Sequence, residues 1–182
     1  MSVLLPRRVA VAVAAVVFLG VTGCSDQGRQ YAVPHEICGI RIPHNVVEPL
    51  LPDGEQLHQA RRALTDGSAF ACQVNVVNGA IAVDVVITEL DKPLTADDKR
   101  VSLKSLKHAK SVHIPGAHWT VQGDNKIHLS TPCGTDWADS LSFRFTFSQG
   151  EKGTEVTRRN TLRFAKAFVP GEKKKEEVCT AK

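Results

Sequence analysis

The residues best able to do chemistry in this 182-residue chain are its five cysteines and seven histidines. Cys24 stands apart because it directly follows a long apolar stretch, and the other four cysteines are spread over the rest of the chain. No two cysteines have the C-x-x-C spacing of a zinc clip. Four cysteines is an even number, which in an exported chain predicts two disulfides. Their members would be Cys38, Cys72, Cys133 and Cys179.

The first 23 residues have the three parts of a secretory signal peptide. Arg7 and Arg8 form a basic start, and the 15 residues from Val9 to Gly23 carry no charge. A membrane-spanning helix needs about 20 apolar residues, so a cleaved signal fits residues 1–23 better than a permanent membrane helix does. We favour general secretion, although the arginine pair also fits the twin-arginine route.

The stretch Val21-Thr22-Gly23-Cys24 resembles a bacterial lipobox. That resemblance implies that the Cys24 thiol receives a diacylglyceryl group and that the chain is cut just before it. The protein would then be anchored on the extracytoplasmic face of the cell membrane, with the membrane as a partner through this lipid. Residues 24–33 would be the lipidated cysteine and a polar tether, and residues 34–182 a single domain.

Length and charge restrict what such a domain can be. Removing 23 of 182 residues leaves 159, a size suited to one domain with a real core. The signal carries two arginines and no acids, so the net charge falls from +4 to about +2. That charge is too small to indicate nucleic acid as a partner.

Two hairpins are predicted. Asn78-Gly79 between β-branched alternating runs is typical of a two-residue turn. It predicts that Val76 opposes Ile81 and that Cys72 opposes Val85, with all four side chains facing the core. These partners belong to a longer set, in which Val77 opposes Ala80, Val74 opposes Val83 and Phe70 opposes Ile87.

The second hairpin covers Ala117 to Ser130. A three-residue loop at 123–125 predicts that Trp119 opposes Leu129 and Val121 opposes Ile127, on one face. His118 and His128 would then share the opposite face as diagonal neighbours about 7–8 Å apart. With His113 they are candidate metal ligands, but the same histidines also suit the solvated face of a sheet, which we favour. No cofactor is predicted.

The helices and the last strand follow from periodicity. Residues 95–107 predict a helix capped by Thr95, with Val101, Leu103 and Leu106 as a narrow apolar stripe. Leu141 to Ser148 alternates as a strand, and Asn160 to Val169 has helical spacing that Pro170-Gly171 interrupts. In residues 42–57 two prolines limit any helix to a turn or two, residues 58–68 fit a helix or a loop, and 172–177 reads as a solvated helical face. The order of elements predicts an α+β domain with a mostly antiparallel sheet covered by one or two helices.

Nearly the whole mature chain resembles small uncharacterised lipoproteins exported by actinobacteria of the streptomycete type. The shared features are the lipobox, a Val-Pro-x-x-x-Cys-Gly entry at 33–39, a Leu-Leu-Pro-x-Gly segment at 50–54, and the cysteines at 72, 133 and 179. This resemblance implies an exported, lipid-anchored protein and brings no catalytic residue with it.

No motif names a reaction. The chain has no G-x-S-x-G elbow, P-loop, G-x-G-x-x-G or H-E-x-x-H. A polar set around Cys133 could make a catalytic group, but it suits surface duty better; it comprises His128, Asp136, Asp139, Ser140 and Ser142. Trp137 is the candidate ligand contact. The leading hypothesis is a non-catalytic binding or accessory protein of the cell envelope with an unknown envelope protein or ligand as partner. The alternative is an envelope enzyme, such as a cell-wall hydrolase, with an unrecognised site.

Four cysteines allow three pairings, and we predict Cys38–Cys72 and Cys133–Cys179. The first would clip the entry segment onto the core face of the first hairpin. The second would fasten the final helix to the strand region that begins at Cys133 and would oppose fraying at a charged C-terminus.

Overall fold

The computed structural model describes residues 28–64, 69–77, 81–135, 138–149, 153–175 and 179. Cys24, the Asn78-Gly79 turn and Trp137 lie outside the described residues. The elements, in chain order, are β1 (Glu36–Ile37), β2 (Ile40–Arg41), α1 (His44–Val47), the 3-10 turn η1 (Glu48–Leu50), β3 (Leu57–Ala63), β4 (Ala69–Val76), β5 (Ile81–Leu90), α2 (Ala96–Ser105), β6 (Lys110–Ser111), β7 (Trp119–Gln122), β8 (Lys126–Pro132), β9 (Ser140–Phe147) and α3 (Glu155–Lys175).

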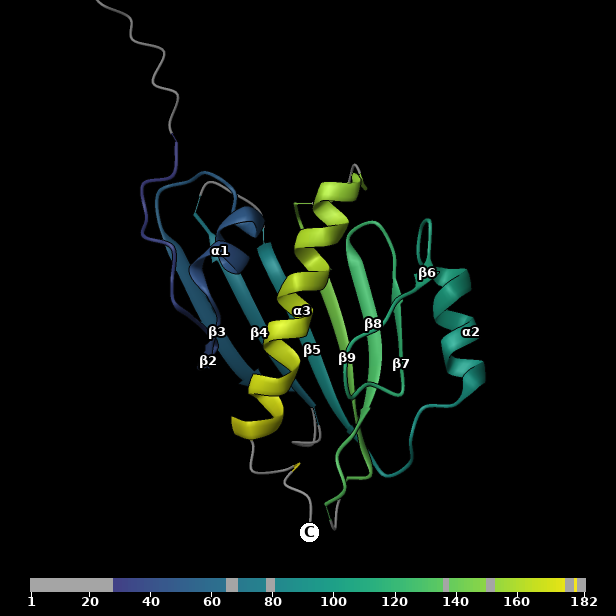
Figure 1. Ribbon diagram of the computed structural model, residues 1–182. Coiled ribbons are helices and arrows are strands. Elements are labelled where there is room, and N and C mark those ends of the chain that lie inside the picture. Colours follow the sequence, from purple (N-terminus) through teal and green to yellow (C-terminus); the bar gives the residue numbers. More distant parts are fainter. Residues whose placement is uncertain are drawn as a thin grey trace, which may run out of the picture.

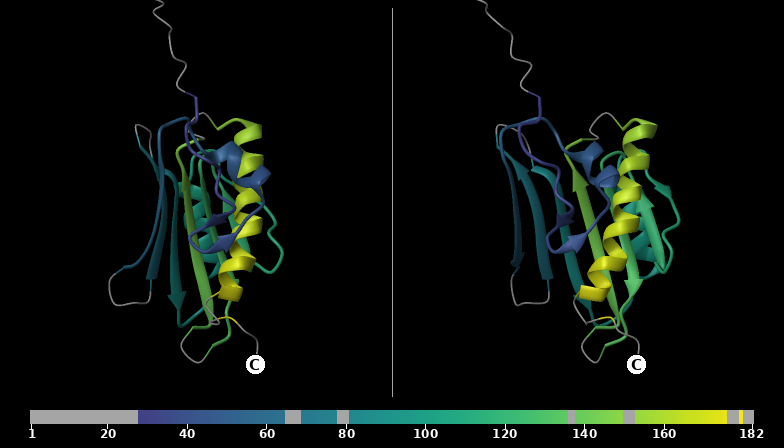
Figure 2. Two further views of the ribbon diagram at one scale, coloured as in Figure 1. Left: turned by 90° about the vertical axis from the view of Figure 1, so that its left-hand side faces the viewer. Right: turned by 60° about the vertical axis from the view of Figure 1, so that its left-hand side comes forward.

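Strands β3 to β9 form one antiparallel seven-stranded sheet in the order β3-β4-β5-β9-β8-β7-β6. Helix α3 runs across one face of it, and α2 lies beside β7 near the β6 edge (Figure 1). The short β1–β2 hairpin and α1 are on the same side of the sheet as α3 (Figure 2). The predicted α+β class and antiparallel sheet are therefore confirmed.

The core lies between β9 and α3. The predicted alternation of β9 is confirmed, since Leu141, Phe143, Phe145 and Phe147 are all buried. Phe164 of α3 meets the Phe145 and Phe147 rings edge-on, at centroid distances of 6.3 and 5.8 Å. Such edge-to-face pairs stabilise a core beyond the area they bury, so this ladder of rings sets how α3 lies on the sheet.

The first hairpin follows the predicted register only in part. Cys72 opposes Val85 and Val74 opposes Val83, as the alternation predicts. A bulge between Val74 and Asn75 then pairs Asn75, not Val76, with Ile81. The predicted Val76–Ile81 pair is therefore wrong, and the Ile81 side chain is 48% exposed because the bulge turns it from the core.

The second hairpin is one residue out of the predicted register. Trp119 opposes Ser130 and Val121 opposes His128, and the Gly123 amide donates to the Lys126 carbonyl at 2.9 Å. The loop is thus two residues long, not three. A slip of one residue moves every side chain of a strand to the other face, so Trp119 faces away from α3. Gln122 takes the inner side, where its amide donates to the Arg158 carbonyl of α3.

Helix α3 does not stop at Pro170. It continues through the proline to Lys175, so the predicted interruption at Pro170-Gly171 is wrong. Gly171 fits here because a Cβ at this position would lie 2.3 Å from an Ile40 side-chain carbon. The extension also buries Glu172 completely, which corrects the prediction of a solvated face at this residue.

Residues 57–63 form the edge strand β3, which is neither of the two alternatives considered for this segment. Most of its side chains are exposed, including the polar His58, Gln59 and Arg62, and charged edge residues such as Arg62 discourage pairing with other chains. Between Ile42 and Leu57 the helical part is limited to α1 and η1, as the prolines predict. None of the helices in the described part of the chain is long and apolar enough to cross a bilayer.

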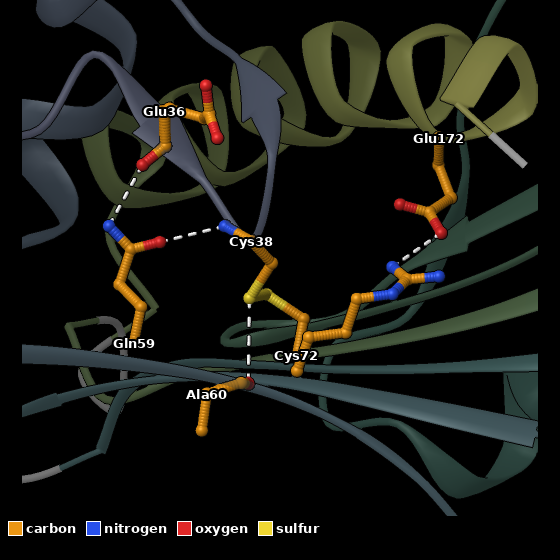
Figure 3. Close-up of a disulfide and its surroundings, with 7 residues drawn as sticks. Glu36, Cys38, Gln59, Ala60, Cys72 and Glu172 are labelled. Carbon is orange, nitrogen blue, oxygen red and sulfur yellow. Dashed lines mark hydrogen bonds and ion pairs between the residues drawn. A yellow bond between two sulfur atoms is a disulfide. The ribbon is translucent and has the colours of Figure 1, made fainter.

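Both predicted disulfides, Cys38–Cys72 and Cys133–Cys179, are present. Cys38 and Gly39 have φ values of +50° and +84° and form the tight turn between β1 and β2. Positive φ is costly for a side chain such as that of Cys38. Gln59 of β3 compensates by accepting from the Cys38 amide at 2.7 Å and donating to the Glu36 carbonyl at 2.9 Å (Figure 3).

Candidate ligand-binding groove

Helix α2 begins where the sequence predicts. The Thr95 side chain accepts from the amides of Asp97 and Asp98, and the Asp98 carboxylate accepts in return from the Thr95 amide at 2.7 Å. This capping box satisfies amides that would otherwise lack partners. The hydrogen bonds from Thr95 also hold the pKa of Asp98 below its ordinary value.

The contact between α2 and the sheet is polar. Within the helix only Ser102 is buried, whereas Val101 is 64% and Leu103 36% exposed. Of the predicted apolar stripe only Leu106, which follows the helix, is buried. A helix that packs on an antiparallel sheet normally buries an apolar stripe. Because α2 buries none, contacts other than apolar packing must hold it against the sheet.

Contacts at its two ends hold α2 in place. Near its start, the Trp119 indole donates to the Leu94 carbonyl at 3.3 Å. Beyond its end, the Asp124 amide donates to the Lys107 carbonyl at 3.1 Å, and His108 contacts the Asp124 carboxylate at 2.9 Å. The hydrogen bond with His108, followed by that with Arg158 of α3, keeps the pKa of Asp124 low. The helix is therefore tied to the rest of the protein on both sides of its middle.

A groove opens under the middle of α2, on the sheet face opposite α3. One hollow of about 280 Å³ and a second of about 420 Å³ share Ser105, His128 and Arg144. The first is lined mainly by Trp119, Leu90, Leu94, Val101, Ser102 and Ser142. The second is lined mainly by Asp84, Val86, Lys126 and Thr146. The groove thus has an aromatic and apolar end and a charged end, a common composition of small-molecule sites.

The charged groups of the groove are not paired with one another. Among the described residues none forms an ion pair or hydrogen bond with the Arg144 guanidinium. Asp98 is engaged by Thr95, which leaves Arg144, Lys126 and Asp84 as the uncommitted charges. Asp98 keeps its negative charge, so the two cations face two carboxylates and the groove has no net charge; what attracts an anion is the unpaired Arg144 guanidinium itself. An unpaired guanidinium in a hollow is suited to binding carboxylate or phosphate.

His128 lies at the centre of the groove. Its Nδ1 is 3.2 Å from the Ser102 hydroxyl, and its strand neighbour on β9 is Arg144. Burial lowers the pKa of His128, and the positive charges of Arg144 and Lys126 lower it further. A neutral imidazole at pH 7 can exchange a hydrogen bond with Ser102 without adding a third cation.

The structure separates the two predicted metal candidates. In the observed register His128 shares its face with Val121, whereas alternation from Thr120 puts His118 toward the opposite face. The prediction that His118 and His128 share a face is therefore wrong. The cause is the same one-residue difference in register that turns the Trp119 side chain to the face opposite α3. Within the described residues no three His, Cys, Asp or Glu side chains gather as a metal site, and this holds for His113 too.

The other predicted site residues do not gather at one place in the structure. Trp137 and Asp136 lie outside the described residues. Ser142 lines the groove, but Ser140 donates to the Lys92 carbonyl, and the serine that meets His128 is Ser102. Trp119, for which a place in the core was favoured over a ligand cleft, lines the groove, and Arg144 was missed as a site residue. For Arg144 a signal existed, since it interrupts the phenylalanines of β9 on the face that alternation turns away from the core.

The shifted titration of His128 is open to direct measurement. We expect its ring to titrate below the ordinary value of about 6.5 and Arg144→Gln to raise its pKa, because one of the two nearby cations is removed. Arg62→Gln is the matched control, since Arg62 lies on the same face in a row with His128 but four strands away. An NMR titration of the His128 ring measures its pKa in both variants. An equal change of this pKa in Arg144→Gln and Arg62→Gln would contradict a specific effect of Arg144 on His128.

The same shift has a consequence for stability. The folded-state pKa of His128 is below the unfolded one, so its contribution to stability is present above about pH 6.5. It is lost as the pH falls through the lower, folded-state value.

Comparison of the chain with protein-family models, with curated proteins and with solved structures finds no match.

Proposed function

We propose that the mature protein is a lipid-anchored lipoprotein on the extracytoplasmic face of the cell membrane, and that the groove under α2 binds a small anionic ligand. The signal peptide and the lipobox at Cys24 support the location. So do the two disulfides, since such bonds are typical of domains outside the cytoplasm. The resemblance to actinobacterial lipoproteins points the same way.

The observation that carries the binding role is Arg144. Its side chain lines a hollow and lacks a partner among the described residues, while a neutral histidine and three serines line the same hollow. Arg61, whose side chain is only 20% exposed, is by contrast paired with Glu172. Arg144 is instead open to an anion from solution, with Lys126 close enough to add to the field.

The opposite end of the groove indicates the shape of the ligand. Trp119 is fixed through its indole nitrogen, and Leu90, Leu94 and Val101 surround it. A rigid indole beside apolar side chains suits a ring or a short apolar body. The ligand class is therefore a small molecule with a carboxylate or phosphate at Arg144 and a ring, such as a sugar, at Trp119.

The contact between Ser102 and His128 is the one feature that favours an envelope enzyme. In a serine hydrolase a carboxylate orients the histidine and stabilises the imidazolium that forms. Here no described carboxylate is hydrogen-bonded to His128, and the neighbouring Arg144 disfavours its charged form. The geometry therefore supports binding over acyl transfer.

Binding can be tested with Trp119 as the reporter. The Trp137→Phe variant leaves Trp119 as the remaining tryptophan of the chain. Hexose 1-phosphate, neutral hexose and inorganic phosphate serve as probes in fluorescence titrations. We expect the hexose phosphate to bind best and Arg144→Gln to weaken it by about 10-fold or more, since a charged hydrogen bond contributes about 1.5–3 kcal/mol.

The control for this titration is Arg62→Gln, which removes an equal charge from the same sheet face outside the groove. It should leave affinity unchanged. Equal losses in both variants, or neutral hexose binding as tightly as its phosphate, would contradict an anion site at Arg144.

A further inference from the structure

The point at which the chain enters the domain is firmly fixed. Arg29 donates to the Leu51 carbonyl at 2.7 Å and to the Glu48 carbonyl at 3.1 Å. The Gln30 amide donates to the Gly54 carbonyl at 2.9 Å. These contacts hold the entering segment against the loop before β3, at one end of the sheet (Figure 1).

Several other segments meet at this same end. The Glu55 amide donates to the carbonyl of Val77, which follows β4. The Phe147 amide at the end of β9 donates to Asn125 in the β7–β8 turn, and Ser148 donates to Ala82 near the start of β5. Helix α3 also begins here and ends at the opposite end of the sheet (Figures 1 and 2).

The tether from the lipid is short. Only five residue steps separate Cys24 from Arg29, which at full extension span about 18 Å. Helix α3, with 21 residues, is about 31 Å long. An anchor at Cys24 therefore keeps the chain-entry end near the bilayer, and the tether is too short for the domain to turn over so that only the far end of α3 meets the lipid.

Apolar side chains are exposed at the chain-entry end. Among the described residues the exposed large hydrophobic side chains are Val77, Ile81, Val101, Leu103 and Val156. Val101 and Leu103 belong to α2, but Val77, Ile81 and Val156 lie at the chain-entry end, with exposures of 36%, 48% and 62%. The bulge in the first hairpin is what exposes Ile81, whose predicted place was the core.

We propose that the chain-entry end is a membrane-contacting surface, on which Val77, Ile81 and Val156 touch the lipid while α3 points away from the bilayer. This surface rests on the lipid anchor of the proposed function. Exposed charges near it are of both signs, with Asp53, Glu55 and Glu155 against Lys126 and Arg159. The contact is therefore apolar and shallow, not an attraction of basic residues to anionic headgroups.

The orientation also places the groove. Lys126 and Asp84 lie at its charged end, and both are close to the turns of the chain-entry end. Trp119 is at the other end of β7. The anion-binding end of the groove therefore faces the membrane side, and the aromatic end is farther from it.

The test uses the mature chain, residues 24–182, with the Cys24 thiol coupled to a maleimide lipid in phosphatidylcholine vesicles. Tryptophan is placed at Ile81, Val156 or Lys92 in a background that carries both Trp119→Phe and Trp137→Phe, so that each variant has one tryptophan, and brominated lipid is the quencher. Lys92 is the matched control because it follows β5 at the end opposite Ile81, about 30 Å along the strand.

We expect quenching at Ile81→Trp and Val156→Trp to exceed that at Lys92→Trp severalfold, and to persist in 0.5 M NaCl. Quenching at Lys92→Trp that equals or exceeds the other two would overturn the proposal, and so would loss of the difference in salt. Because the lipid is attached chemically, the result does not depend on lipidation in the cell, whose failure would show separately in the fractionation of Cys24→Ser.

Discussion

Replacement of Cys24 by serine is expected to move the protein from the membrane fraction to the soluble fraction. A serine hydroxyl cannot form the thioether that carries the diacylglyceryl group. Each buried methylene of the acyl chains contributes about 0.8 kcal/mol to membrane binding, so loss of two chains removes nearly all of it. Three exposed apolar side chains of the chain-entry end are too few to replace them. Fractionation of cells and detergent phase partitioning measure the change.

Ser25→Ala is the control for this experiment, since it alters the neighbouring residue but leaves the thiol. It should stay in the membrane fraction. If Cys24→Ser still partitions with detergent, the lipobox interpretation is wrong, and the membrane-contacting surface loses its anchor in the cell.

Arg61→Met is expected to destabilise the domain strongly. Arg61 Nη1 lies 2.6 Å from a carboxylate oxygen of Glu172, whose side chain is fully buried (Figure 3). Removing the arginine leaves that carboxylate buried without its partner, which costs about 3–5 kcal/mol. For a domain of this size the melting temperature should fall by roughly 10 °C, which thermal unfolding by circular dichroism would show.

Substitution of the other partner, Glu172→Gln, should lower the free energy of unfolding by less. Arg61 is about one-fifth exposed and also lies over the Phe70 ring at 5.1 Å. In the Glu172→Gln variant its guanidinium therefore remains partly hydrated and in contact with an aromatic ring. The double variant Arg61→Met with Glu172→Met should regain much of the loss, because apolar pairs often replace buried ion pairs without cost. Arg62→Met is the surface control, and a fall equal to that of Arg61→Met would contradict this account.

The fold class and the disulfide pairing could be predicted from the sequence because local signals agreed with the tertiary structure. The β9 alternation, the Thr95 cap and the prolines around α1 each act within a few residues. Strand β3 could not be predicted, because it is an exposed edge strand whose side chains are mostly polar and lack alternation. What makes it a strand is pairing with β4, which lies outside its own sequence.

The candidate groove was missed because its position depends on one residue of register. A three-residue loop puts Trp119 in the core and brings the histidines together, whereas the observed two-residue loop reverses both. Nothing in residues 117–130 decides between the loops. In the fold, Asp124 at this turn binds two residues from outside the hairpin, His108 after α2 and Arg158 of α3, and these contacts fit the two-residue loop. Likewise, the packing of Gly171 against Ile40 allows α3 to pass Pro170.

The burial of the Cys38–Cys72 bond affects how the protein meets reductants in its surroundings. Cys72 is inaccessible to solvent and Cys38 nearly so, and Gln59 holds the β1–β2 turn closed above them. A thiolate must reach a sulfur in line with the bond to break it. The lifetime of this bond therefore depends on how often the β1–β2 turn lifts from β3, and a given concentration of thiol reduces it more slowly than it would an exposed disulfide.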